Sequence, residues 1–215
     1  MTEQDWQRFL QAPGLEDWRT LFSGPCAHFR TTSLAHGASL VSAIAALDGI
    51  DRHPPAIDLR PGGVTVRLAR DIEDVSDHDV VMARRISEVA RELGAPAEAT
   101  RLQHIQVAVA SHPEAGIRPF WQAVLGYERV GREDFVDPQR RGPSFWVQDL
   151  DGHQALQHAF HIDIAVPAEV GEARVAAALA AGGRIADDRR APDWWTLADA
   201  AGNKVDVATW PDRIE

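Results

Sequence analysis

The chain has a single cysteine, Cys26, among 215 residues. One cysteine cannot form an intrachain disulfide, which excludes a disulfide-stabilised secreted scaffold. There is also no run of about 18 apolar residues, so we expect no membrane-spanning helix, and residues 1–10 lack the charged-then-apolar order of a signal peptide. We therefore expect a cytoplasmic protein with no membrane partner, and we interpret Cys26 as a small packing residue rather than a nucleophile.

Positive charge is scarce as well. The chain has 22 Lys and Arg against 32 Asp and Glu, which gives a formal net charge of −10. Nucleic-acid binding relies on clustered Lys and Arg, so we expect no nucleic-acid partner. A hydrophobic content of 45% is typical of a folded globular protein, and the length accommodates two domains of about 100 residues each.

Glycine and proline divide the first part of the chain into short elements. We predict helices at 15–22, 33–47 and 76–93, a strand at 27–31, and a hairpin of strands 56–59 and 64–68. The hairpin turn contains Gly62 and Gly63, where we expect a positive φ. This order predicts an α+β domain with helices on one face of an antiparallel sheet. Residues 95–100 are small, contain proline and lack apolar periodicity, so we assign them as a linker between domains 1–94 and 101–215.

The second half of the chain repeats itself. His104 and His161 each begin an alternating apolar run that leads into a helix-like stretch, and Gly126 and Gly183 follow them at the same spacing. A repeat of this length that occurs twice indicates two copies of one supersecondary unit. We predict that each copy is a strand, a helix and further strands, with these main elements: 102–110, 113–125, 144–148, 160–166, 169–181, 194–197 and 205–209.

The two units resemble the vicinal-oxygen-chelate superfamily of glyoxalases and extradiol dioxygenases over residues 102–210. The resemblance lies in the two strand-opening histidines, the helix that ends at Gly126, and the closing segment 199–206. It implies paired βαβββ modules and a divalent metal held by the first and last strands of each module.

The ligand positions that this resemblance implies are His104, Gln148, His161 and Asp206. Such mixed nitrogen and oxygen ligation suits Zn, Ni, Fe(II) or Mn(II). Two positions depart from the superfamily pattern: Asp206 is shorter than the usual Glu, and Gln148 is a weak neutral ligand. Alternatively, all four are ordinary strand residues, because the fold by itself does not establish catalysis.

The first domain resembles pterin-4a-carbinolamine dehydratase over about residues 18–93. The resemblance lies in segments 50–55, 63–68 and 76–83. It implies loss of the 4a-hydroxyl from a tetrahydropterin, which needs an acid for the leaving hydroxyl and a base for the N5 proton. His53 matches the second His of the family's His-His-Pro motif, and Asp79 matches its helix-opening Asp. No cofactor is implied for this domain.

Other positions of this motif differ, so we expect a degenerate dehydratase site. Arg52 replaces the first His and cannot shuttle protons because it stays charged. A third His is missing where Asp71 stands, and Asp71 is a candidate carboxylate base. Asp79 also has a structural interpretation, because Ser76 and Asp79 have the spacing of a helix-capping pair.

Three functions remain open from the sequence. The first is a lyase of pterin chemistry with candidate catalytic residues His53, Asp79, Arg52 and Asp71. The second is a metal-dependent glyoxalase-like or dioxygenase-like enzyme that acts through the second domain. The third is a non-catalytic protein that binds small molecules, a pterin-like one in the first domain. Because paired modules leave sheet edges, we also predict a homodimer.

Overall fold

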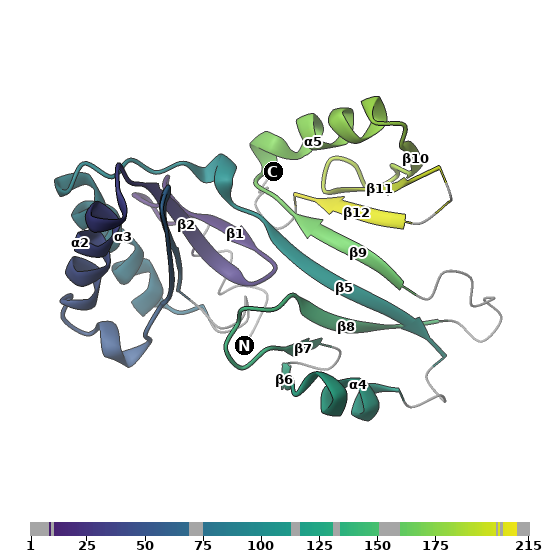
Figure 1. Ribbon diagram of the computed structural model, residues 1–215, viewed down its shortest axis with the longest axis horizontal. Coiled ribbons are helices and arrows are strands. Elements are labelled where there is room, and N and C mark those ends of the chain that lie inside the picture. The colour runs from purple at the N-terminus through teal and green to yellow at the C-terminus, as the bar shows by residue number, and fades with distance from the viewer. Residues whose placement is uncertain are drawn as a thin grey trace. The chain divides into compact units, whose positions relative to one another are not determined.

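The computed structural model describes residues 9, 11–68, 75–112, 117–130, 134–150, 160–200, 202 and 204–209 (Figure 1). The chain divides into two compact units, the first formed mainly by residues 1–103 and the second by residues 104–210. Within the described residues, no helix has the length and apolar character needed to cross a membrane. Each unit is described separately below.

The first unit is a four-stranded antiparallel sheet with two helices on one side (Figure 1). The strand order is β1-β2-β4-β3. Its elements are β1 (Arg19–Leu21), β2 (Gly24–Arg30), α2 (Leu34–Ala45), η1 (Ile50–Arg52), β3 (Ala56–Arg60), β4 (Gly63–Arg67), α3 (Asp77–Glu92) and η3 (Ala99–Arg101). The predicted α+β class is confirmed. The predicted cap of α2 is present, since the Ser33 hydroxyl accepts a hydrogen bond from the His36 backbone N–H.

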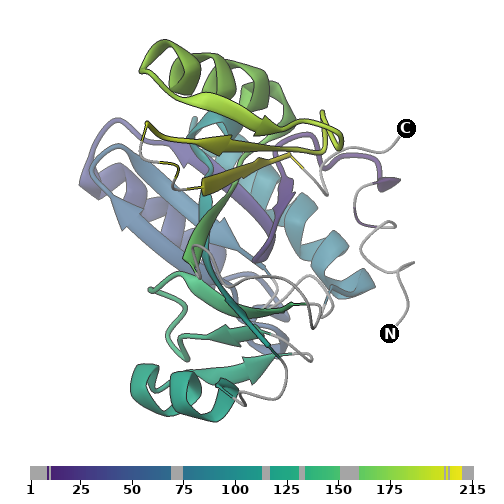
Figure 2. The same cartoon turned by 90° about the vertical axis from the view of Figure 1, so that its right-hand side faces the viewer.

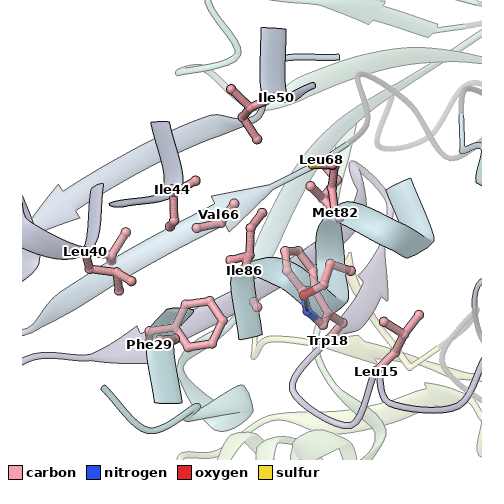
Figure 3. Packing of buried hydrophobic residues seen from close by; sticks show 14 of the residues in the cluster. Leu15, Trp18, Phe29, Leu40, Ile44, Ile50, Val66, Leu68, Met82 and Ile86 are labelled. Carbon is pink, nitrogen blue, oxygen red and sulfur yellow. Dashed lines mark hydrogen bonds between the residues drawn. The ribbon is translucent and has the colours of Figure 1, made fainter. Parts of the chain in front are cut away.

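The core of this unit lies between the helices and the sheet (Figure 3). It is built from alternate residues of β2 and β4 and from the inner faces of α2 and α3: Ala27, Phe29, Val64, Val66, Leu40, Ile44, Met82 and Ile86. Full burial of one large apolar side chain stabilises the fold by about 1.5–3 kcal/mol. The core also includes Trp18, whose indole N–H donates to the Ala83 carbonyl and to Ser87 Oγ on α3.

One predicted element of this unit is wrong. The predicted helix at 15–22 is instead a turn followed by the strand β1, because Arg19–Leu21 pairs with β2. The segment predicted as a linker also pairs with β2 of the first unit. Its residue Ala97 pairs with Phe29, and the Glu98 backbone N–H donates to the His28 carbonyl. This segment forms hydrogen bonds with the backbone of β2 beyond the end of β1. Those hydrogen bonds hold it on the sheet although its sequence has no apolar periodicity.

The second unit contains two βαβββ modules that share one eight-stranded sheet. The first module is β5 (His104–Ser111), α4 (Arg118–Leu125), β6 (Glu128–Val130), β7 (Asp134–Val136) and β8 (Ser144–Asp149). The second is β9 (Phe160–Ala165), α5 (Ala168–Ala180), β10 (Arg184–Asp187), β11 (Trp194–Ala198) and β12 (Lys204–Ala208). The strand order is β10-β11-β12-β9-β5-β8-β7-β6. The repeat seen in the sequence therefore corresponds to two structural modules.

The two modules meet at β5 and β9, which run antiparallel in the centre of the sheet. Gln106 pairs directly with Asp163, and these two residues occupy equivalent positions in the repeat. Helix α5 packs on one face of the second module, against Trp195, Leu197 and Val207 (Figure 2). Because side chains alternate along a strand, Asp163 and its pairing partner Asp206 lie on the face of the sheet opposite α5.

In the first unit, the turn between β3 and β4 packs closely against β2. Neither Gly62 nor Gly63 has a positive φ, so the expected reason for these glycines is wrong. Gly63 is required for close approach instead: a Cβ there would lie 2.5 Å from His28 Nε2 and 2.6 Å from the Phe29 carbonyl oxygen. A Cβ at Gly62 would meet nothing within 4 Å.

We expect Gly63→Ala to lower the free energy of unfolding by about 1–3 kcal/mol, because the added methyl group overpacks a backbone contact. The matched variant Gly62→Ala should change it by less than about 0.5 kcal/mol. Urea denaturation of both variants measures the difference. Equal stabilities would contradict the packing described for this turn.

Candidate functional site

The first cluster of functional side chains surrounds Asp79, in the first turn of α3. The Asp79 side chain is 1% exposed. Its Oδ2 accepts hydrogen bonds from the Ser76 backbone N–H at 2.8 Å and from the Ser76 hydroxyl at 2.6 Å. The interpretation of Ser76 and Asp79 as a capping pair is confirmed by this arrangement. Both of these hydrogen bonds go to Oδ2, so Ser76 does not hold the other carboxylate oxygen, Oδ1.

Oδ1 faces His53, which follows the short helix η1. Its Nδ1 lies 3.9 Å from Asp79 Oδ1, and its side chain is 53% exposed. The structure thus brings two of the residues predicted from the sequence together, an accessible imidazole and a buried carboxylate. The two side chains lie within ion-pair distance of each other.

A second imidazole, which the sequence analysis missed, belongs to this cluster. His78 lies immediately before Asp79 on α3, and its ring centroid is 5.5 Å from that of His53, with the rings at 81°. His78 Nε2 is buried and has no hydrogen-bond partner among the described residues. The signal was its position next to Asp79 at the start of the helix.

The other two predicted residues of this domain are not placed in the cluster. Arg52 is the last residue of η1 and its side chain is exposed. Asp71 lies outside the described residues. Neither one is shown to contact His53 or Asp79.

The second cluster lies on the face of the C-terminal sheet that α5 leaves uncovered. It consists of His161 and Asp163 on β9 and Asp206 on β12, whose potential ligand atoms all lie within 4.8 Å of one another. Asp163 and Asp206 are directly paired across β9 and β12. His161 is two residues before Asp163 on the same strand, so both side chains point to the same face. The cluster can therefore offer one imidazole and two carboxylates to a cation.

Asp163 is the centre of this cluster. Its Oδ1 lies 3.3 Å from His161 Nε2, and its Oδ2 accepts a hydrogen bond of 2.8 Å from the Trp146 indole N–H. The Trp146 ring also stands edge to face with the His161 ring, with centroids 6.1 Å apart. Oδ1 is buried and accepts no well-aligned hydrogen bond in the described part of the chain. Trp146 thus fixes one oxygen of Asp163 and leaves the other toward His161.

The electrostatics of the cluster shift the pKa values of two members. Interaction with the Asp163 carboxylate raises the pKa of His161 above its ordinary 6.5, although burial acts in the opposite direction. Burial raises the pKa of Asp206, and a hydrogen bond with Thr196 opposes that rise. His161 thus holds its proton more tightly than a free imidazole, and that proton lies beside two carboxylates.

The four metal ligands predicted for this domain do not come together as one set in this chain. His161 and Asp206 belong to the cluster. His104 pairs with Ala165, whereas the residue opposite His161 is Ala108. Four residues of strand, about 13 Å, therefore separate the level of His104 from that of His161. Gln148 pairs with Ala110, on the other side of His161 from Asp206.

Asp163, in contrast, was missed by the sequence analysis. The available signal was its spacing of two residues from His161 within a predicted strand, which places both side chains on one face.

Comparison with known proteins identifies both halves of the chain. Residues 1–89 match the family model of pterin 4 alpha carbinolamine dehydratase, and residues 104–208 match that of the glyoxalase-like domain. The chain is therefore a fusion of a pterin-4a-carbinolamine dehydratase domain with a glyoxalase-like domain. No curated protein matches it in sequence.

Several solved structures are similar to part of the chain. A glyoxalase/bleomycin resistance protein/dioxygenase superfamily member from Vibrio splendidus 12B01 has 14% identity, a TM-score of 0.34, and covers 49% of this chain and 97% of its own. A fosfomycin resistance protein, FosX, from Listeria monocytogenes, complexed with Mn(II) and sulfate ion, has 14% identity, a TM-score of 0.23 and coverages of 54% and 96%. The oxidase ChaP-H2 has 21% identity, a TM-score of 0.22 and coverages of 52% and 95%.

Proposed function

We propose that the N-terminal domain is a lyase that eliminates water from a 4a-hydroxytetrahydropterin, with His53 and Asp79 at the reacting centre. The observation that carries this proposal is the accessible His53 imidazole 3.9 Å from a buried carboxylate oxygen. The match of residues 1–89 to the dehydratase family supplies the substrate class. We also propose that the protein is cytoplasmic and forms a homodimer.

The reaction requires two proton movements and no cofactor. The C4a–O bond breaks as an acid protonates the leaving hydroxyl, and water departs. The N5–H bond gives its proton to a base, and its electron pair forms the C4a=N5 double bond of the product. His53 carries one of these protons in this proposal, which is supported by its exposure and by the buried carboxylate beside it. Asp79 orients the ring and balances its charge when it is protonated.

We predict that His53→Gln lowers the rate of 4a-hydroxytetrahydropterin dehydration by about 10²-fold or more, since loss of a general acid or base costs about 10²–10⁴-fold. The rate is measured by absorbance and corrected for uncatalysed decay. His36→Gln is the matched control, because His36 lies near the start of α2, whereas His53 follows the opposite end of that helix. Its rate should equal that of the wild type.

Two results would contradict this proposal. One is a wild-type rate no higher than the uncatalysed rate, combined with no pterin binding by calorimetry. The other is an active wild type whose rate does not change in His53→Gln.

We propose as a second function that the C-terminal domain binds a divalent metal through His161, Asp163 and Asp206. This is supported by the donor set, which suits Zn, Ni, Fe(II) or Mn(II). It is also supported by the separation of 3.3 Å between His161 Nε2 and the buried Asp163 Oδ1. Two ligand atoms at typical zinc distances on a tetrahedral ion lie about 3.3 Å apart.

The residues around this set have definable roles in a loaded site. A bound divalent ion supplies a Lewis acid that polarises an oxygen of a substrate. Trp146 holds Asp163 in place through its indole N–H, and Thr196 is hydrogen-bonded to Asp206. Partners of this kind fix ligand orientation and contribute about 10–100-fold to metal affinity. His161 must lose its proton to act as a ligand.

We predict that chelator-treated protein takes up roughly one divalent ion per chain, and that His161→Gln or Asp163→Asn lowers the affinity by at least about 10-fold. Mass spectrometric metal analysis after dialysis against Zn, Ni, Mn(II) or Fe(II) measures this. Affinity should fall as the pH falls, because a proton with a raised pKa on His161 competes with the metal.

The variant His104→Gln distinguishes this set from the one implied by the repeat. We expect it to bind metal as the wild type does. Loss of metal in His104→Gln but not in Asp163→Asn would contradict the proposed ligands. No uptake of any of the four metals would leave the C-terminal domain as a non-metal ligand-binding domain.

A further inference from the structure

We propose that His78 is the second proton-transfer group of the dehydratase site, which restores the imidazole that Arg52 removes from the family motif. The inference rests on the proposed lyase function of the N-terminal domain. It concerns a residue that lies outside the motif positions matched by the sequence resemblance. Three observations carry it: the position of His78, its unsatisfied nitrogen, and its geometry with His53.

The position of His78 is fixed by the start of α3. It lies between Asp77 and Asp79 in the first turn, and Ser76 holds that turn through its two hydrogen bonds to Asp79. The ring lies against Gly49, a residue with φ of +83°, where an added Cβ would be 3.6 Å from His78 Cε1. That distance is an ordinary van der Waals contact, so the positive φ, and not the ring, accounts for the glycine.

The unsatisfied nitrogen leaves the ring with one open hydrogen-bonding position. His78 Nε2 is buried and has no hydrogen-bond partner among the described residues. A buried polar atom without a partner costs free energy, and most buried polar atoms in proteins therefore have one. A bound substrate that offers an N–H or O–H to Nε2 removes this cost.

The geometry with His53 matches the chemistry of the elimination. The two rings come from different elements, η1 and α3, and their centroids are 5.5 Å apart at an angle of 81°. The reaction needs one group to protonate the 4a-hydroxyl and another to accept the N5 proton, and these sites are on adjacent atoms of the pterin. His53, with the Asp79 carboxylate at 3.9 Å, is assigned as the acid. His78 is assigned as the base, which accepts the N5 proton at Nε2.

The protons given and taken by the two histidines balance over one turnover. His53 gives a proton to the hydroxyl, which leaves as water, and His78 takes the proton from N5 as the C4a=N5 bond forms. Nothing is oxidised or reduced. A proton then returns from His78 to His53 through solvent, which the exposed His53 ring contacts, before the next substrate binds.

The test compares His78→Gln, His53→Gln and the double variant with wild type and with His36→Gln, in the full chain. We expect each single variant to lower kcat by about 10²-fold with little change in KM, because each loses a proton-transfer group rather than binding. The double variant should be only slightly slower than either single one, since residues that act as a unit are not additive. His36→Gln should match the wild type.

A chemical rescue separates catalysis from packing and covers the case of a variant that folds poorly. Free imidazole should restore part of the rate of His78→Ala and leave the rate of His36→Ala unchanged. A purely structural role would give lower thermal stability without rescue.

The outcomes for the two proposals are distinct. Wild-type activity lost in His53→Gln but kept in His78→Gln would overturn the role of His78 and leave the lyase function standing. A rate loss in His78→Ala that imidazole does not rescue, with lower thermal stability, would also overturn it. No turnover by the wild type would overturn both.

Discussion

The burial of the Asp79 carboxylate is the constraint on which the N-terminal site depends. An ionised carboxylate removed from water costs several kcal/mol unless hydrogen bonds replace the lost solvation. Ser76 provides two of them to a single oxygen, and the same contacts begin α3. The start of the helix and the position of the carboxylate are thus fixed together. The oxygen that Ser76 does not hold is the one that faces His53.

The C-terminal cluster follows the same principle on a sheet. A neutral donor, the Trp146 indole, holds one oxygen of Asp163, and the other oxygen faces an imidazole. The difference is the second carboxylate, Asp206, which pairs with Asp163 across β12 and β9. Two carboxylates in one place favour a cation, either the proton on His161 or a metal ion. The two clusters thus differ in the number of carboxylates beside the imidazole, one at His53 and two at His161.

Features that depend on a few neighbouring residues could be predicted from the sequence. Features that depend on the pairing of distant strands could not. The Ser76–Asp79 cap and His53 were found because their signals span a few residues. His104 and Gln148 were predicted as ligands beside His161 and Asp206 because the superfamily resemblance implies a ligand on the first and last strand of each module. In the antiparallel β5–β9 pair, however, His104 and His161 lie on opposite sides of the central Gln106–Asp163 pair. Asp206 pairs with Asp163, whereas Gln148 pairs with Ala110. The short strand β1 was also missed, because only its partner β2 makes it a strand.

The central claim is that His53 and its neighbours form a pterin site, and a direct test is to observe their imidazoles while a reduced pterin binds. In NMR spectra of the full chain titrated with a tetrahydropterin, we expect saturable shifts of the His53 and His78 ring signals. The ring signals of His104 and His161 should not move. Signals of His53 and His78 that stay unchanged at saturating pterin, or shifts confined to the C-terminal histidines, would contradict it.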